Sequence, residues 1–181
     1  MAFSPANAWL EQAESDMRVA TILKNKIEAD ASGFESHFYL YCQIIAKCQQ
    51  VVEKAIKAII AELDYRRLVP FTIGFTHTVD PIINRILIAP ARHKDSLQPI
   101  QATLKNNLPD IRAVMELAPH GRAGAQNPKN TEYPYSNSSN VLIAPASRNA
   151  FQWDEVQRYH RTAGLIKKKA SELIDVVKVT P

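Results

Sequence analysis

Residues 38–63 read FYLYCQIIAKCQQVVEKAIKAIIAEL, and we expect the rest of the chain to be organised around them. Apolar side chains recur there at steps of three and four, which places them on one face of an α-helix: Phe38, Tyr41, Cys42, Ile45, Cys48, Val52, Ala55, Ile56, Ile59 and Leu63. Three more apolar residues, Ile44, Val51 and Ile60, widen this face beyond what a surface helix needs. Neither proline nor glycine interrupts the segment. We therefore predict that 38–63 is the central helix of an all-helical bundle, covered on more than one side.

Local signals predict two helices that flank the central one. Ser4 and Pro5 are typical of a helix start, the serine as N-cap and the proline as first helical residue. The apolar spacing that follows predicts a helix that ends before Gly33. A shorter helix is expected over 76–88, with Pro81 in its first turn, where proline is tolerated.

The second half of the chain predicts two further helical regions separated by an irregular one. Residues 97–118 keep helical spacing, but Pro109 predicts a break or kink, with Asn107 as the cap of a new helix. The last helix is expected to begin at 153. Residues from about 119 to 150 are rich in glycine, proline, serine and asparagine, so we expect a long irregular loop there. The predicted fold is an all-α, up-and-down bundle of five or six helices.

Composition describes an ordinary globular protein. The chain has 181 residues, enough for one domain over 1–181 with a real core, and its five glycines suit helices better than sheets. The net charge of +4 permits an anionic partner without demanding one. No apolar run reaches the roughly 20 residues that cross a bilayer, and the N-terminus lacks the pattern of a signal peptide.

The two cysteines, Cys42 and Cys48, lie six residues apart on the expected central helix. Their α-carbons are then separated by about 9 Å along the axis, at ~1.5 Å per residue, which is too far for a disulfide within this helix. Two buried thiols suit a reducing compartment, so we expect a cytoplasmic protein in which both cysteines serve as small core residues.

Residues 49–58 read QQVVEKAIKA and resemble the second helix of the HEPN domains, whose pattern is close to QQAAEKALKALL. Other elements of that family follow in the same order over nearly the whole chain. The expected first helix carries Trp9-Leu10, Ala13, Asp16-Met17 and Ala20, the third opens with Thr76-His77, and Glu132-Tyr133-Pro134 resembles the family's RYP element before the last helix. The EKA-x-KA part is the most specific of these pieces.

The resemblance also supplies a test for catalysis. Many HEPN domains are metal-independent ribonucleases with an arginine followed, after four to six residues, by a histidine that acts as general base or acid. Here His77 is too far from Arg67, and seven residues separate Arg112 from His120, one more than the motif allows. We therefore expect no robust ribonuclease activity, with Arg112 and His120 as the only catalytic candidates.

Sequence motifs for metals and cofactors are absent. The chain contains no HExxH, GxGxxG, P-loop or GxSxG motif, and its histidines do not show paired ligand spacing: His37, His77, His93, His120 and His160. We accordingly expect neither a metal nor a cofactor.

The chain is locally basic just after the 97–118 helix, because Glu116 is the only acid between residues 112 and 131. Irregular backbone leaves amide groups free to meet phosphate oxygens, and tyrosines offer a face on which a base can stack. We therefore predict a ligand site beside the end of this helix, formed by Arg112, His120, Arg122, Lys129, Tyr133 and Tyr135.

The resemblance implies a non-catalytic module that binds a nucleotide or RNA, because HEPN domains are similar to the helical domain of kanamycin nucleotidyltransferase and many work with a small nucleotidyltransferase partner. One alternative is a variant HEPN ribonuclease, the toxin of a toxin–antitoxin pair. Another is a helical dimer with a scaffold role only. Family members commonly pair, so we expect a homodimer with two-fold symmetry.

Overall fold

The computed structural model describes residues 4–30, 36–70, 78–89, 94–117, 129–132, 135–136, 139, 141–148 and 150–179. Within these ranges the chain forms five α-helices: α1 (Pro5–Ala29), α2 (Tyr41–Tyr65), α3 (Asp80–Leu87), α4 (Lys94–Met115) and α5 (Trp153–Val179). A 3-10 turn, η2 (Phe38–Leu40), leads into α2. The predicted all-α fold of five or six helices is confirmed.

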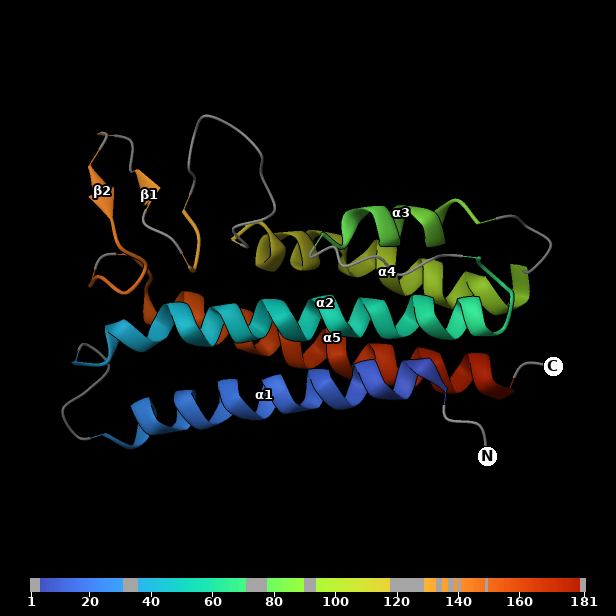
Figure 1. Ribbon diagram of the computed structural model, residues 1–181, viewed down its shortest axis with the longest axis horizontal. Helices are drawn as coiled ribbons and strands as arrows, with labels where there is room; N and C mark the ends of the chain where they lie inside the picture. The colour runs from blue at the N-terminus through green and yellow to red at the C-terminus, as the bar shows by residue number, and fades with distance from the viewer. Residues whose placement is uncertain are drawn as a thin grey trace.

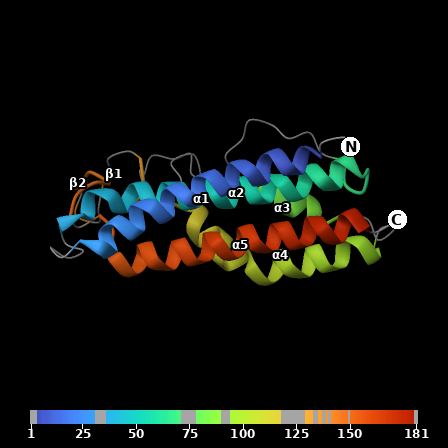
Figure 2. The same ribbon diagram turned by 90° about the horizontal axis from the view of Figure 1, so that it is seen from below.

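Helix α2 lies at the centre of the bundle (Figure 1) and contacts each of the other four helices. In this view α1 runs along one side of α2, while α3 and α4 lie on the opposite side and α5 lies behind. Seen from below, α1 and α2 lie on one side of the molecule and α4 and α5 on the other (Figure 2). Helices α1 and α5 run antiparallel, so the start of α1 and the end of α5 lie at the same end of the bundle (Figure 1).

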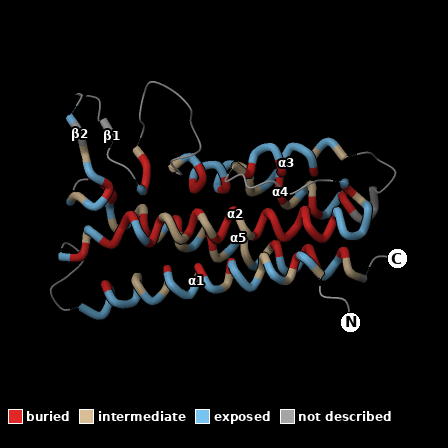
Figure 3. Tube along the Cα trace, in the orientation of Figure 1, coloured by how far each residue is buried: buried red, intermediate tan, exposed pale blue. Residues whose placement is uncertain are grey.

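The central helix is buried along almost its whole length (Figure 3), with 18 of its 25 residues buried. Its wide apolar face explains this burial, since one side packs against α1 and α5 and another against α3 and α4. Cys42 and Cys48 are both free and buried, as predicted for core residues. Burial raises the pKa of Cys42 and raises that of Cys48 to about 12, which keeps both thiols protonated.

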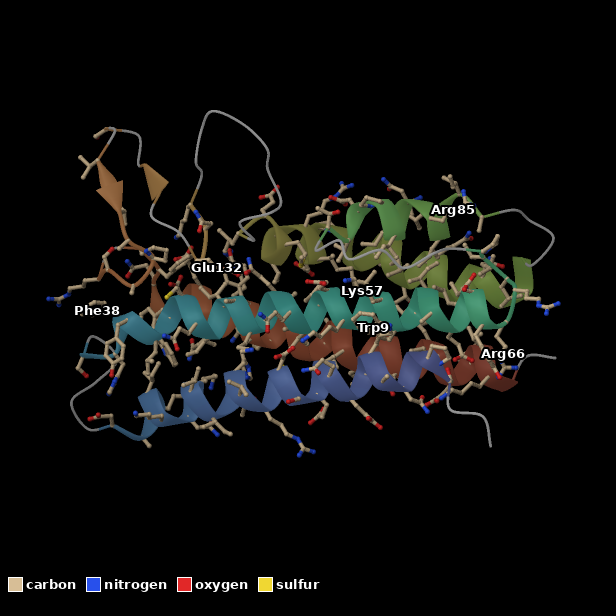
Figure 4. The ribbon with its side chains drawn as sticks, in the orientation of Figure 1. Trp9, Phe38, Lys57, Arg66, Arg85 and Glu132 are labelled. Atoms are coloured by element: carbon tan, nitrogen blue, oxygen red, sulfur yellow. The ribbon has the colours of Figure 1, made fainter. Side chains whose placement is uncertain are left out.

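The start of α1 follows the predicted capping. Ser4 Oγ accepts a hydrogen bond from the amide of Ala6 at 3.3 Å, and Pro5 is the first helical residue. The same hydroxyl donates to the carboxylate of Glu62, which is 1 % exposed and also accepts from Arg66 Nε at 3.1 Å. Arg66, labelled in Figure 4, lies at the end where α1 begins and α2 and α5 terminate. Arg66 Nη2 also donates to the carbonyl oxygen of Lys178 at 3.3 Å, so these polar contacts join the start of α1 to the ends of α2 and α5.

Helix α4 contradicts part of the prediction, because it continues through Pro109 without a new helix start. Asn107 does not cap a second helix: its Nδ2 donates to the carbonyl oxygen of Thr103 at 2.7 Å, within the same helix. Figure 2 shows the axis of α4 changing direction toward its C-terminal end. A kink fits the missing N–H of Pro109 and the clash of its ring with the preceding turn.

The irregular region before α5 contains one short β-pairing among its described residues. Strand β1 (Tyr135–Ser136) pairs antiparallel with β2 (Leu142–Ile143), so that Tyr135 lies opposite Ile143. Figure 1 shows this pair at the end of the bundle where α2 begins.

Helix α3 begins at Asp80, and the Thr76-His77 pair expected to open it lies outside the described residues. None of the helices that the structure describes has the length and apolarity needed to cross a bilayer.

Candidate functional site

A row of polar residues crosses the buried centre of the bundle on α2. Gln49, Glu53 and Lys57 recur every four residues, so they lie along one edge of the helix. They are only 5 %, 8 % and 4 % exposed. Burying such groups is unfavourable unless each finds a hydrogen-bond or ionic partner, so their partners show what the row does.

Gln49 connects α2 to the end of α4 and to the segment that follows it. Its Nε2 donates to the carbonyl oxygen of Val114 at 3.0 Å, and its Oε1 accepts from Thr131 Oγ1 at 2.9 Å. The amide of Thr131 donates in turn to the carbonyl oxygen of Leu117 at 3.2 Å. We call these four residues the Gln49 clamp. The clamp joins the two flanks of the 118–130 segment to each other and to the central helix.

Glu53 and Lys57 form an ion pair one turn further along, with Nζ and Oε1 2.7 Å apart. The Lys57 ammonium also lies 5.1 Å from the centroid of the Trp9 ring, on α1. Figure 4 shows Lys57 and Trp9 on these two neighbouring helices. A cation over an indole face is attracted by the ring's quadrupole, so this buried charge is held by one carboxylate and one aromatic side chain.

Asp16 of α1 forms a buried ionic link between α1 and α2. One oxygen accepts from Lys47 Nζ at 3.1 Å and the other accepts from Lys54. The Asp16 side chain is 5 % exposed, whereas the two lysines are 33 % and 18 % exposed and therefore keep contact with water. Lys47 also donates to Gln50 at 2.8 Å. Three polar residues of the 49–58 segment, Gln49, Lys54 and Lys57, thus contact other parts of the bundle, which fits their presence in a largely apolar helix.

Arg112, the first of the predicted site residues, lies in the last turn of α4. Its Nε donates to Oδ1 of Asp80 at 3.0 Å, and the two side chains are 49 % and 53 % exposed. Asp80 is the first residue of α3, so this ion pair links the end of α4 to the start of α3.

Lys129, the second predicted cation, is anchored at the start of α5. Its Nζ donates to both carboxylate oxygens of Glu155, at 3.0 and 3.1 Å, and lies 4.4 Å from the centroid of the Phe151 ring. Phe151 is fully buried, and Glu155 also accepts from the amide of Gln152 at 2.8 Å. Three contacts therefore hold Lys129 in place: the Glu155 carboxylate, the Phe151 ring and, two residues later in the chain, the Gln49 clamp.

The remaining predicted site residues are not described to the same extent. His120, Arg122 and Tyr133 lie outside the described residues, and for Tyr135 only the backbone, in β1, is described. Sequence reasoning missed the residues that hold the two placed cations, Asp80 and Glu155. It also missed the clamp, although a glutamine on a buried helix face, as in the Gln49-Gln50 pair, is a signal that an amide partner lies nearby.

A histidine bridges the first and last helices away from this site. The hydroxyl of Thr21 donates to the carbonyl oxygen of Met17 at 2.8 Å, so at its 3.0 Å contact with His160 it must accept, and His160 Nε2 is the donor. Burial lowers the pKa of His160, and the nearby ammonium of Lys24 lowers it further, against a smaller opposing effect of Glu28.

A surface groove of about 650 Å³ runs between α1 and α5. The Glu14 carboxylate, one of its lining groups, accepts from Lys167 and, at 3.2 Å, from Arg18. These two hydrogen bonds lower the pKa of Glu14. Arg18 and Lys167 thus share one carboxylate of the chain itself, and Lys168, the third cation of the groove, lies 3.8 Å from Glu172. In the part of the chain that the structure describes, no three His, Cys, Asp or Glu side chains gather as a metal site would require.

Comparison with known proteins adds no relative: no family model matches the chain, and no curated protein or solved structure matches it significantly.

Proposed function

We propose that the chain is a non-catalytic, HEPN-like binding module that holds a nucleotide or RNA at the end of α4, and that it works in the cytoplasm with a small nucleotidyltransferase partner. The observation that carries this proposal is the Gln49 clamp. It fixes Lys129 and the flanks of the basic 118–130 segment beside the helix end that bears Arg112. A set of cations held by a packed core is better organised for binding than the same charges on a free loop, because less ordering is needed when the ligand arrives.

The acids that pair with the two placed cations compete with a ligand, and the energies decide that competition. Arg112 and Asp80 are both about half exposed, and such surface pairs contribute about 0–1 kcal/mol. A charge-assisted hydrogen bond from arginine to phosphate contributes about 1.5–3 kcal/mol. A phosphate group can therefore replace Asp80 as the partner of Arg112. The pair of Lys129 with Glu155 is less exposed, so we expect Lys129 to contribute less than Arg112 or Arg122.

The same contacts support binding without catalysis. A general base must come within roughly 3 Å of the proton that it takes while a cation holds the phosphate. The extra residue between Arg112 and His120 departs from the spacing of the ribonuclease motif, in which both groups must reach the same phosphodiester. RNA cleavage that is lost in both Arg112→Ala and His120→Ala would instead identify the ribonuclease toxin.

Binding can be tested by fluorescence anisotropy with a fluorescein-labelled single-stranded RNA and, in a parallel titration, with labelled ATP, both at low salt. We expect Arg122→Ala with Lys129→Ala to weaken binding at least tenfold, because two charge-assisted contacts are lost. Lys105→Ala with Lys168→Ala removes the same charge from exposed positions elsewhere on α4 and α5 and should change the affinity little. Equal effects of the two double variants, or none from the first, would place the site elsewhere.

Self-association as a two-fold dimer is part of the same proposal and rests on the family resemblance. The broad apolar face of α2 does not add to it, since α1, α3, α4 and α5 cover this face within one chain. Light scattering at tens of micromolar checks the expectation, and a monomer at that concentration would contradict it.

A further inference from the structure

The end of α4 shows why the Gln49 clamp exists. The last carbonyl groups of a helix have no partner within the helix and need one from elsewhere. Here the carbonyl oxygen of Val114 receives the Gln49 amide and that of Leu117 receives the Thr131 amide. Gln49 lies 65 residues before Val114 in the sequence, whereas Thr131 belongs to the next described stretch after Leu117. Both donors are buried, since Gln49 and Thr131 are 5 % exposed.

The clamp also fixes the two cations relative to each other. Val114 follows Arg112 by two residues, and Thr131 follows Lys129 by two residues. The Gln49 side chain bonds to Val114 with its nitrogen and to Thr131 with its oxygen, so a single amide sets the distance between the two cation-bearing backbones. Neither cation touches Gln49 in any contact that the structure describes. Its effect on them is exerted through the backbone.

We propose that Gln49 is a positioning residue for the phosphate groups of the ligand, which it serves by holding Arg112 and Lys129 at a fixed separation. This inference rests on the proposed function and goes beyond it, because Gln49 is buried and contacts no ligand. The loss of one ordinary hydrogen bond from the clamp should raise the population in which residues 129–132 have separated from α2 about fivefold to tenfold.

Thr131 offers the sharpest perturbation, because its hydroxyl can be removed with little change of shape. Thr131→Val deletes the donor to Gln49 Oε1, whereas Thr131→Ser keeps the hydroxyl and should restore the wild-type behaviour. Thr21→Val is the matched control. It removes another threonine hydroxyl that meets a side chain of a distant helix, His160, at a site remote from the clamp. Gln49→Leu, which removes both side-chain bonds, should act more strongly than Thr131→Val.

The test combines hydrogen–deuterium exchange of the full chain with RNA anisotropy on the same variants. In Thr131→Val we expect the exchange of peptides that contain residues 129–132 to rise about fivefold to tenfold, and the affinity for labelled single-stranded RNA to fall by a similar factor. Thr131→Ser and Thr21→Val should match the wild type in both measurements.

The outcomes separate this inference from the proposed function. Faster exchange with unchanged RNA affinity would overturn the positioning role and leave the proposed function standing. Unchanged exchange in Thr131→Val would overturn the clamp itself. A wild-type protein that binds neither RNA nor ATP would overturn the proposed function and the ligand role of Gln49 with it, whatever the exchange data show about the segment.

Discussion

Asp16 provides a measurement of how much burial strengthens an ion pair in this bundle. Its carboxylate accepts from two ammonium groups of α2, and each charge-assisted hydrogen bond contributes about 1.5–3 kcal/mol. In Asp16→Asn one oxygen still accepts from a lysine, but the new NH₂ group faces the other lysine and forms no bond with it. Lys47 and Lys54 are partly exposed and can be hydrated, which limits the loss. We expect the free energy of unfolding to fall by about 3 kcal/mol, roughly 150-fold in the equilibrium constant.

Urea titrations followed by far-UV circular dichroism and by tryptophan fluorescence measure this change, and Tm should fall by roughly 6–12 °C for a chain of this size. Glu14→Gln is the matched control, because Glu14 lies on the same helix and also accepts from two cations but is 42 % exposed. Exposed pairs contribute about 0–1 kcal/mol, so this variant should remain within 1 kcal/mol of the wild type. A double-mutant cycle of Asp16→Asn with Lys54→Met reports the coupling directly. If Asp16→Asn and Glu14→Gln lower the free energy of unfolding by the same amount, burial does not strengthen the Asp16 contacts and the reasoning is refuted.

Three further outcomes follow from the pKa shifts and from the helix kink. Burial lowers the pKa of His160 below its ordinary value of 6.5. As the pH falls, the unfolded chain therefore protonates His160 at a higher pH than the folded chain does. The free energy of unfolding should therefore fall as the pH drops from about 6.5 through the folded-state pKa, and His160→Gln should flatten this part of a urea-titration series. Since the pKa of Cys48 is raised to about 12, the native protein should react with Ellman's reagent at pH 8 far more slowly than the urea-unfolded chain; equal rates would contradict the burial of its thiol. Pro109→Ala restores a helical N–H at an exposed position and should stabilise the chain by about 1 kcal/mol in thermal unfolding; a loss of stability would show that the packing of α4 depends on the kink.

Helix α4 shows where local sequence rules fail and why. Pro109 predicts a break or kink with a new helix capped by Asn107, because proline removes one hydrogen bond and crowds the preceding turn. Apolar side chains on both sides of it, Leu104, Ile111 and Val114, are buried in the bundle. Burial of such side chains contributes about 1.5–3 kcal/mol each, so the three together exceed the roughly 3 kcal/mol that proline costs in a helix interior. The helix therefore bends and continues, a result that depends on neighbours the local sequence does not specify.

The sequence alone determined the helical class, the central position of 38–63 and the start of α1. These features depend on the spacing of apolar residues and on capping between neighbours in the chain, which are local properties. The position of the basic segment after α4 could be predicted for the same reason, because charge is read directly from composition.

Only the tertiary structure decided which partners those residues acquire. The acids that hold Arg112 and Lys129 lie 32 and 26 residues away, and the two partners of the Gln49 side chain lie 65 and 82 residues away. A polar group can be buried only where other elements bring a donor or acceptor within about 3 Å, and this proximity is created by the packing of helices. The sequence shows that Gln49 is polar on an apolar helix, but the fold decides that its amide joins the end of α4 to Thr131.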